Sequence, residues 1–191
     1  MAKGWALISV WDKSGLKELA EVILRCDYRL LATSNTAQFL RQVNLNVTEV
    51  SKWTNAPEIL GGRVKTIHPK IAAGILSLRG NEGIEPIDIV VCNLYPFLQG
   101  VKEKKDLQEM IELIDIGGVT LLRSAAKNWR FVVPVPEPKY YPLVINELQG
   151  YGAVRERVRL QLARATFELT SSYDQEIANY FAKLVKEDAQ I

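Results

Sequence analysis

Short apolar runs alternate along this chain with segments whose apolar residues recur at helical spacing, and this alternation restricts the fold more than any other feature. Residues 5–10 form a short apolar run suited to a buried strand, and residues 14–26 then carry apolar residues at helical intervals. The same order returns as a strand over 28–33, a helix over 36–43 and a short strand over 46–50. Strands that alternate with helices predict an α/β fold of three layers, with an open, mainly parallel sheet flanked by helices.

The pattern is looser in the middle of the chain and becomes helical at its end. Residues 51–66 have no clear period and carry a proline and two glycines, which predicts a loop with a short helix at 56–60. The last third, residues 153–185, is helix-forming, with an expected break at Ser171 and Ser172. Between these segments we expect helices from residue 69, over 107–113 and over 117–126, and strands over 87–93 and 131–135.

The length and composition suit one folded unit. A chain of 191 residues with 48% hydrophobic residues can bury one sizeable core and leaves little room for a second. The α/β pattern gives way to helix around Gly150 to Gly152. We therefore expect an α/β core over residues 1–150 and a helical tail over 151–191 that packs on the same domain.

Composition argues against several classes of partner and site. The 24 Lys and Arg against 22 Asp and Glu give a net charge of +2, with no run of like charges that would indicate nucleic-acid binding. No apolar stretch approaches the roughly 18 residues that a membrane span requires. Cys26 and Cys92, in a chain with no signal peptide, indicate reduced thiols in a cytoplasmic protein. A single histidine, His68, argues against a metal cluster.

Polar residues follow three of the expected strands, at the edge where open parallel sheets bind their ligands. Residues 11–14 follow the first strand, 33–36 the second and 93–95 the fourth. Hydroxyls and amides at a helix start, as in residues 33–36, can hold a phosphate monoester. Ordinary helix capping by Ser34 or Asn35 is the alternative, and the residues alone leave it open.

Two further segments carry charged groups beside glycines. In GGRVKT, residues 61–66, the glycines permit close backbone approach, Arg63 can make bidentate contacts and Lys65 can act as a point charge or an acid–base group. Asp115 precedes two glycines at an expected helix start, where it is either an acid or base beside an anion hole or simply the N-cap. A solvated basic loop and a capped helix remain the alternatives, and Lys127 would by default be a favourable charge at the helix end.

Four separated motifs, in order, closely resemble the inosine monophosphate (IMP) cyclohydrolase domain of bifunctional purine-biosynthesis proteins. They are SVWDKSG at 9–15, LGGRVKTIHP at 60–69, CNLYPF at 92–97 and DIGGVTLLRSAAKN at 115–128. The resemblance runs from about residue 6 to residue 180 and includes the tail segments ARATF at 163–167 and SYD at 172–174. It implies a methylglyoxal-synthase-like fold, in agreement with the pattern of strands and helices.

The resemblance implies an enzyme, a hydrolase acting on a cyclic amidine, that closes 5-formamidoimidazole-4-carboxamide ribotide to IMP with loss of water in de novo purine biosynthesis. It implies a small-molecule purine ribotide as substrate and no metal or organic cofactor. In the family a much larger formyltransferase domain normally follows, so we expect a separate formyltransferase to supply the substrate. A homodimer is also expected, for which the helical tail offers apolar side chains at Phe167, Tyr173, Tyr180 and Phe181.

The resemblance also implies which residues form the site. The implied catalytic group is Lys65, Tyr95, Asp115 and Lys127. The residues implied to bind the substrate are Trp11, Asp12, Lys13, Ser14, Thr33, Ser34, Asn35, Thr36, Arg63, Val64, Thr66, Cys92, Asn93, Ile116, Gly117 and Gly118.

We hypothesise that amides near Ile116 and Gly117, with Lys65, stabilise an oxyanion while Lys127 or Asp115 moves protons. Asp115 and Lys127 stand 12 positions apart, so a straight helix at about 1.5 Å per residue would separate their backbones by roughly 18 Å. Three explanations stay open: the segment bends, Lys127 reaches a different part of the ligand, or it serves a neighbouring subunit.

Two sites depart from the family's pattern. Trp11 stands where the family usually has a small hydroxyl residue, and Ser34 and Asn35 stand where it has a glycine pair. A tryptophan there either crowds the phosphate loop or covers the ligand, and a serine alters how the loop presents its amides. Two alternatives therefore stay open: a non-catalytic purine-nucleotide-binding regulatory module of the same fold, and a methylglyoxal-synthase-type lyase acting on a triose phosphate. The lone histidine and the cyclohydrolase motifs count against the lyase.

Overall fold

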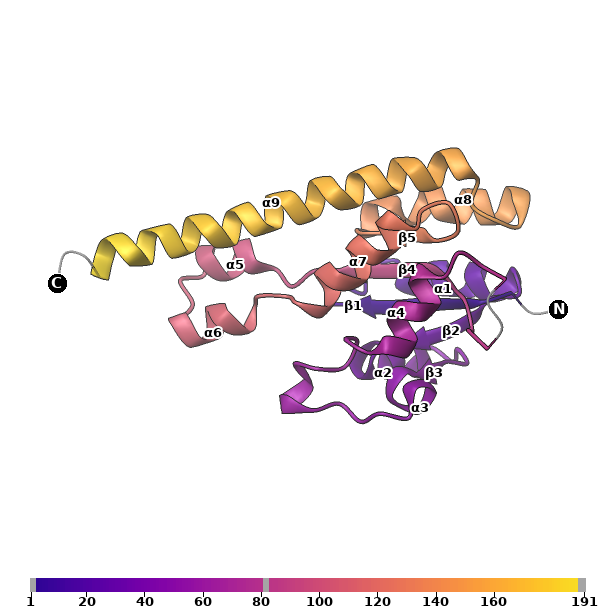
Figure 1. The fold of residues 1–191 in the computed structure, drawn as a ribbon, viewed down its shortest axis with the longest axis horizontal. Coiled ribbons are helices and arrows are strands. Elements are labelled where there is room, and N and C mark those ends of the chain that lie inside the picture. Colours follow the sequence, from indigo (N-terminus) through magenta and orange to yellow (C-terminus); the bar gives the residue numbers. More distant parts are fainter. Residues whose placement is uncertain (1–2, 81–82, 189–191) are drawn as a thin grey trace.

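Five parallel strands form the sheet at the centre of the molecule, in a computed structural model that describes residues 3–80 and 83–188. The strand order is β3-β2-β1-β4-β5, and every neighbouring pair is parallel (Figure 1). The predicted α/β fold with a parallel sheet is therefore confirmed. The strands are β1 (Trp5–Val10), β2 (Arg29–Ala32), β3 (Thr48–Glu49), β4 (Ile87–Asn93) and β5 (Val133–Val135).

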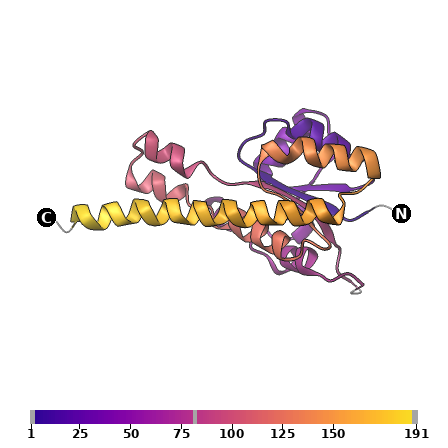
Figure 2. The same ribbon diagram turned by 90° about the horizontal axis from the view of Figure 1, so that it is seen from above.

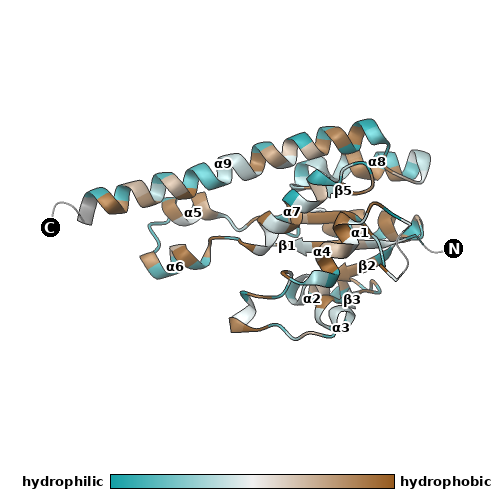
Figure 3. Ribbon diagram, in the orientation of Figure 1, coloured by the Kyte–Doolittle hydropathy of each residue, from teal (hydrophilic) through white to brown (hydrophobic). Residues whose placement is uncertain are grey.

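Helices cover both faces of the sheet, which gives the fold its three layers (Figure 2). Alternate residues of β1 point to opposite faces, so Ala6 and Ile8 pack into one core cluster while Trp5 and Leu7 pack into the other. In Figure 3 the strands are largely brown, the colour of hydrophobic residues. The first face is covered by α1 (Leu16–Arg25), α2 (Ser34–Gln42) and α8 (Tyr141–Tyr151), and the second by α3 (Val50–Thr54), α4 (Pro69–Leu76) and α7 (Gly117–Lys127).

One long helix, α9 (Glu156–Asp188), runs past the β5 edge of the sheet and extends beyond it (Figures 1 and 2). Its first part contacts β5 and α7, and its later part contacts α5 (Phe97–Lys102), while α6 (Leu107–Glu112) follows α5 in the chain. The break expected at Ser171 and Ser172 is wrong, because the helix is continuous there. The flanking Thr170 and Tyr173 are buried, so tertiary packing holds this segment helical.

The remaining differences from expectation lie between the regular elements. The short helix expected at 56–60 is absent, because α3 ends at Asn55 in a left-handed conformation and residues 59 and 64 then pair as an antiparallel bridge. Helices α5 and α8 are additional to the expected elements. Pro142 lies in the first turn of α8, where its missing N–H leaves no hydrogen bond unmade.

Two further points concern the ends of the chain and the membrane. Residues 1–2 and 189–191, at the outer ends of the expected core and tail, lie outside the described residues. Among the helices that are described, none combines the length and the apolar character that a membrane crossing would need.

Replacing a fully buried residue of β4 tests this account of the core. Ile89→Ala removes a side chain with 0% exposure, so we expect the free energy of unfolding to fall by about 2–5 kcal/mol. The measurement is urea unfolding followed by circular dichroism. Leu78→Ala is the matched control, because Leu78 is 71% exposed and its truncation should change the value by about 0.5 kcal/mol or less. Equal losses in the two variants would contradict the placement of the core.

Candidate active site

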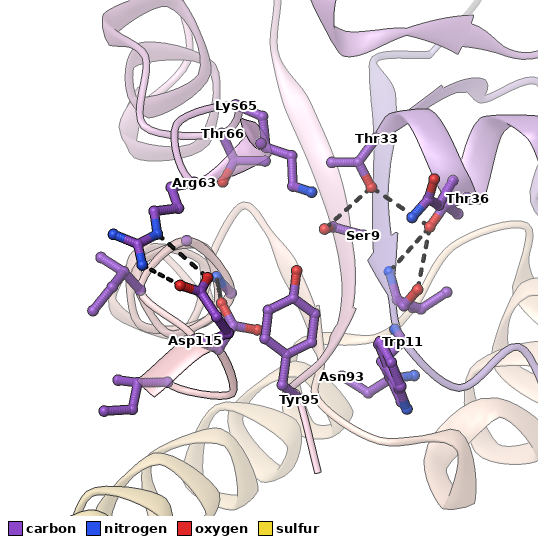
Figure 4. A pocket seen from close by; sticks show the side chains of 18 of the residues that line it. Ser9, Trp11, Thr33, Thr36, Arg63, Lys65, Thr66, Asn93, Tyr95 and Asp115 are labelled. Atoms are coloured by element: carbon purple, nitrogen blue, oxygen red, sulfur yellow. Dashed lines mark hydrogen bonds and ion pairs between the residues drawn. The ribbon is translucent and has the colours of Figure 1, made fainter. Parts of the chain in front are cut away.

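The carboxyl ends of three neighbouring strands meet at one edge of the sheet and open onto a cavity. From β1 the chain moves to one side of the sheet through β2 and β3, and it then returns to the other side of β1 at β4. Open parallel sheets bind ligands where the strand order reverses in this way. The cavity measures about 630 Å³, within the usual range for a small-molecule site. Its walls come from the loops after β1, β2 and β4, the loop before α4 and the segment that leads into α7 (Figure 4).

The first loop, after β1, is held in place by Asn93 at the end of β4. The Asn93 Oδ1 accepts hydrogen bonds from the amides of Trp11 (2.6 Å) and Asp12 (2.9 Å), and its Nδ2 donates to the Asp12 carbonyl (2.8 Å). The Asp12 carboxylate accepts from the Ser14 amide at 2.8 Å, and hydrogen bonds from Ser14 hold the pKa of Asp12 below its usual value. The side chains of Asn93 and Asp12 therefore shape the loop.

The second loop, after β2, is tied to the first by hydroxyl groups. Thr36 is buried, and its hydroxyl donates to the Val10 carbonyl and accepts from the Val10 amide, each at 3.3 Å. The Thr33 hydroxyl donates to the Ser9 hydroxyl at 3.3 Å. These contacts fix the start of α2 beside the end of β1, so the two loops form one continuous wall (Figure 4).

Ser34 does not take part in this wall. Its hydroxyl contacts the carboxylate of Glu58 and, at 3.1 Å, that of Glu49, while the neighbouring Asn35 lines the cavity. An anion at this loop would therefore meet Asn35 and the amides at the start of α2, because the Ser34 hydroxyl is engaged by carboxylates.

A tight hairpin before α4 brings basic residues to the cavity. The Ile59 amide donates to the Val64 carbonyl at 3.1 Å, and between them Gly61 and Gly62 have φ of 64° and 90°. Side chains rarely adopt this left-handed backbone, which explains the two glycines. Beyond the turn, the chain presents three polar side chains to the cavity: Arg63, Lys65 and Thr66.

The two cations of this hairpin have different surroundings. Arg63 donates from Nε to the Glu112 carboxylate at 3.3 Å and contacts the same carboxylate through Nη2, so its charge is already compensated. Within the described residues, Lys65 has no carboxylate at ion-pair distance. Its ammonium group points into the cavity, as does the hydroxyl of Tyr95 (Figure 4). Of these two cations, Lys65 is therefore the one that can compensate negative charge on a ligand.

Two glycines at the start of α7 allow polar groups to approach the backbone closely. The Asp115 Oδ1 accepts from the Gly118 amide at 2.6 Å, and a Cβ at Gly118 would lie 2.5 Å from Asp115 Oδ2. A Cβ at Gly117 would lie 2.5 Å from the Thr66 hydroxyl oxygen. Larger residues at either position would displace these groups. With the Gly118 amide occupied, the amides of Ile116 and Gly117 donate to no acceptor within the described part of the chain.

Burial shifts the acidities of the two groups that face Lys65. It raises the pKa of Asp115, and the amides of Gly118 and Tyr95 and the charge of Lys65 oppose that shift without cancelling it. Burial, followed by the charge of Asp115, raises the pKa of Tyr95. Asp115 is therefore better suited to exchanging a proton near neutral pH than an exposed aspartate, and Tyr95 remains a hydrogen-bond donor.

An aromatic pair borders the cavity beside the first loop. The rings of Trp11 and Tyr95 meet edge to face, with centroids 5.5 Å apart and an interplanar angle of 80°. Trp11 is nevertheless 56% exposed, so its indole offers free surface to a ligand.

The structure brings most of the expected site residues to this one cavity. Of the expected residues, those that line it are Trp11, Lys13, Thr33, Asn35, Thr36, Arg63, Lys65, Thr66, Asn93, Tyr95, Asp115, Ile116, Gly117 and Gly118. Those that do not are Asp12, Ser14, Ser34, Val64, Cys92 and Lys127. Asp12 and Ser14 form the turn after β1, Val64 pairs through its backbone, and Cys92 is buried in the core.

Lys127 lies at the opposite end of α7 from Asp115. The helix is continuous from Gly117 to Lys127, a length of about 16 Å at about 1.5 Å per residue, so the explanation in which this segment bends is wrong. Lys127 is exposed and does not line the cavity. A catalytic role for it stays a prediction.

Several lining residues were not expected to bind the ligand. Ser9 and Val10 end β1, and their place at the carboxyl end of a strand is a signal that could have identified them. Ile111 and Glu112 carry no such signal, because α6 reaches the cavity only through tertiary packing. Glu112 contacts Arg63, which lies 49 positions earlier in the chain. Over residues 3–80 and 83–188, no three His, Cys, Asp or Glu side chains gather as a set of metal ligands.

Comparison with known proteins assigns the two parts of the chain to two family models. Residues 15–120 match the MGS-like domain, and residues 125–191 match the AICARFT/IMPCHase bienzyme. The chain is 46% identical over 185 residues to the bifunctional purine biosynthesis protein PurH of Thermoanaerobacter sp. (strain X514), and 45% identical over 183 residues to that of Persephonella marina (strain DSM 14350 / EX-H1). These matches cover 92% and 91% of this chain but only 36% of each relative.

The fold also matches a solved structure, described as the crystal structure of ForH. The TM-score is 0.82 at 33% sequence identity, and the match covers 94% of this chain and 97% of that chain. The structural similarity therefore extends over nearly the full length of the two chains compared.

Adding a methyl group at residue 118 tests the contact between Asp115 and the start of α7. In Gly118→Ala the new Cβ would lie 2.5 Å from Asp115 Oδ2, so the carboxylate must move and its hydrogen bond from residue 118 must weaken. The Gly118 amide stabilises the charged form of Asp115, so we expect the pKa of Asp115 to rise further when this contact is lost. Carbon-13 NMR titration measures it. Gly150→Ala, with nothing within 4 Å of its Cβ, is the control; an unchanged pKa in Gly118→Ala would contradict this geometry.

The raised pKa of Asp115 also predicts a pH-dependent stability. A carboxyl group whose pKa is higher in the folded state than in the unfolded chain stabilises the fold below its unfolded pKa, and it loses this contribution as pH rises through the folded pKa. Asp115→Asn cannot lose it. The free energy of unfolding of the variant minus that of the wild type should therefore be larger at neutral pH than in acid, because only the wild type loses stability as pH rises. Urea unfolding over this pH range measures the difference, and a difference that grew toward acid would contradict the sign.

Proposed function

This chain belongs to the MGS-like domain family, and from that premise we propose that it is an IMP cyclohydrolase, which closes 5-formamidoimidazole-4-carboxamide ribotide to IMP with loss of water. The segment that matches the AICARFT/IMPCHase bienzyme and the similarity to proteins named bifunctional purine biosynthesis protein support the proposal. The chain spans about a third of the length of those relatives, at 36%.

The proposal is carried by one observation. Lys65, Tyr95 and Asp115 come from three separate segments of the chain, yet they line one cavity large enough for a ribotide. The loops after β1 and β2 stand at the same cavity and bring Lys13, Asn35 and the start of α2 to it, where a phosphate group can be held.

The chemistry requires both orientation and charge stabilisation. The carboxamide nitrogen attacks the formyl carbon, a proton leaves that nitrogen, and the formyl oxygen becomes the hydroxyl of a tetrahedral intermediate. The attack itself closes the ring, and loss of this hydroxyl with the proton of the formamido nitrogen then releases water and forms a C=N double bond. The nucleophile and the electrophile are both weak, so the site must hold the two arms together and neutralise the oxyanion. No electrons are exchanged, and the proposal requires no cofactor.

The residues of the cavity divide these tasks. Lys65, which has no acidic partner among the described residues, stabilises the oxyanion together with the free amides of Ile116 and Gly117. Asp115 transfers protons during attack and dehydration, with Tyr95 as a hydrogen-bond donor beside it. Residues assigned to the phosphate end are Lys13, Thr33, Asn35 and Thr36, with the Trp11 indole covering the ligand.

A homodimer remains part of the proposal. Lys127 does not line the cavity of its own chain, so a catalytic Lys127 would either contact a part of the ligand outside the cavity or serve a neighbouring copy. We also propose that the protein acts in the cytoplasm, in de novo purine biosynthesis, and that a formyltransferase supplies its substrate.

A second candidate function is a regulatory module that binds purine nucleotides without turnover. The observation that favours it lies at the phosphate end, where Trp11 protrudes and the Ser34 hydroxyl is engaged by Glu49 and Glu58. This candidate keeps the cavity and its ligand class but assigns no proton transfer to Asp115.

Turnover of the formylated ribotide distinguishes the candidates. The wild type should form IMP, followed by its ultraviolet absorbance, and Lys65→Ala should lower kcat by about 100-fold or more through loss of oxyanion stabilisation. Lys52→Ala, at an exposed lysine on α3, is the control and should retain full activity. Binding of IMP without turnover would favour the regulatory module, and release of methylglyoxal from a triose phosphate would favour a lyase. Full activity in Lys65→Ala would remove the main support for the mechanism.

A further inference from the structure

One side chain of the tail helix, Tyr173, is hydrogen-bonded to the backbone that carries Asp115. Tyr173 lies midway along α9 and is 5% exposed, although Asp174 beside it in the SYD segment is exposed. Tyr173 does not line the cavity. Its position behind the cavity wall raises the question of what a buried phenol contributes there.

The Tyr173 hydroxyl is bound on both sides by the backbone that carries Asp115. It donates to the Leu113 carbonyl at 2.7 Å and accepts from the Asp115 amide at 3.0 Å. Burial raises the pKa of Tyr173 well above its usual value, so the phenol keeps the proton that the first bond requires. The hydroxyl thus links the backbone of Leu113 to that of Asp115, within the turn between α6 and α7.

The ring of Tyr173 packs on the segment that directly follows Tyr95. It packs edge to face on Phe97, with centroids 6.3 Å apart, in a buried cluster that also contains Met110. The Phe97 amide donates to the carbonyl of Tyr95 at 2.9 Å. A single side chain of α9 therefore joins the segment that carries Tyr95 to the turn that carries Asp115.

We infer that Tyr173 is a positioning residue that holds the Asp115 carboxylate at its place in the cavity. Asp115 is fixed at two points: its carboxylate by the Gly118 amide, and its own amide by the Tyr173 hydroxyl. Without the second contact the 113–115 turn can shift while the start of α7 stays in place. The inference deepens the proposed function and rests on it, because it concerns the group to which proton transfer is assigned.

Removing only the hydroxyl tests the inference. Tyr173→Phe keeps the ring in its cluster and loses both hydrogen bonds, so we expect kcat for ring closure to fall about ten- to a hundredfold through misplacement of Asp115. KM should change little, because Tyr173 touches no part of the cavity. Tyr180→Phe is the matched control: Tyr180 lies on the same helix and packs on the same Phe97 ring at 5.6 Å, and its hydroxyl makes no hydrogen bond within the described residues. It should retain the wild-type kcat.

A second measurement keeps the inference separate from the proposed function. The pKa of Asp115, followed by carbon-13 NMR and assigned with Asp115→Asn, should rise in Tyr173→Phe as the Gly118 contact loosens, and stay unchanged in Tyr180→Phe. Should the wild type lack turnover, the proposed function would fail while a shifted pKa would still support the positioning role. An unchanged kcat together with an unchanged pKa in Tyr173→Phe would overturn it, as would equal losses in the two tyrosine variants.

Discussion

Parallel pairing of β1 with β2 on one side and β4 on the other is the constraint on which the rest of the structure depends. Because all strands run the same way, their carboxyl ends meet at one edge, and the loops after them must meet there too. The chain uses this edge for every group that we assign to chemistry. The register even extends to Asn93, which ends β4 opposite Val10 and then fixes the loop that follows β1.

Close approach of side chains to backbone determines what the cavity can do. Gly117 and Gly118 leave room for the Thr66 hydroxyl and the Asp115 carboxylate, and the contact with the Gly118 amide removes that amide from the set of free donors. Any oxyanion therefore has Lys65 and the two preceding amides as its donors. Burial then raises the pKa of Asp115 against the opposing effect of the Gly118 and Tyr95 amides and of the Lys65 charge. Holding the charged form of Asp115 in a buried position therefore lowers the stability of the folded state slightly. Acid–base groups with shifted pKa values are common at functional sites.

The long helix α9 has two separate roles in this arrangement. Near its start it packs on β5 and α7, where it covers an edge of the sheet that would otherwise expose unpaired backbone groups. Further along, the helix supports the α5–α6 segment and places Tyr173 behind the cavity wall, bound to the backbone of Asp115. The tail is thus joined to the site by hydrogen bonds as well as by hydrophobic contact.

The sequence by itself determined the class of fold, the order of the strands and the segments that form the site's loops, because periodicity, turn residues and motifs are local properties, although it did not indicate α8. Lys65, Tyr95 and Asp115 were indicated together only by the resemblance of the four motifs to a known family, and the structure places all three at one cavity. Tertiary structure alone decided the rest. The serines at 171 and 172 remain helical because buried neighbours hold them, Glu112 reaches Arg63 across 49 positions, and Lys127 is kept from the cavity by an unbroken helix. Such outcomes depend on contacts between distant segments, and a single sequence does not encode them in any local pattern.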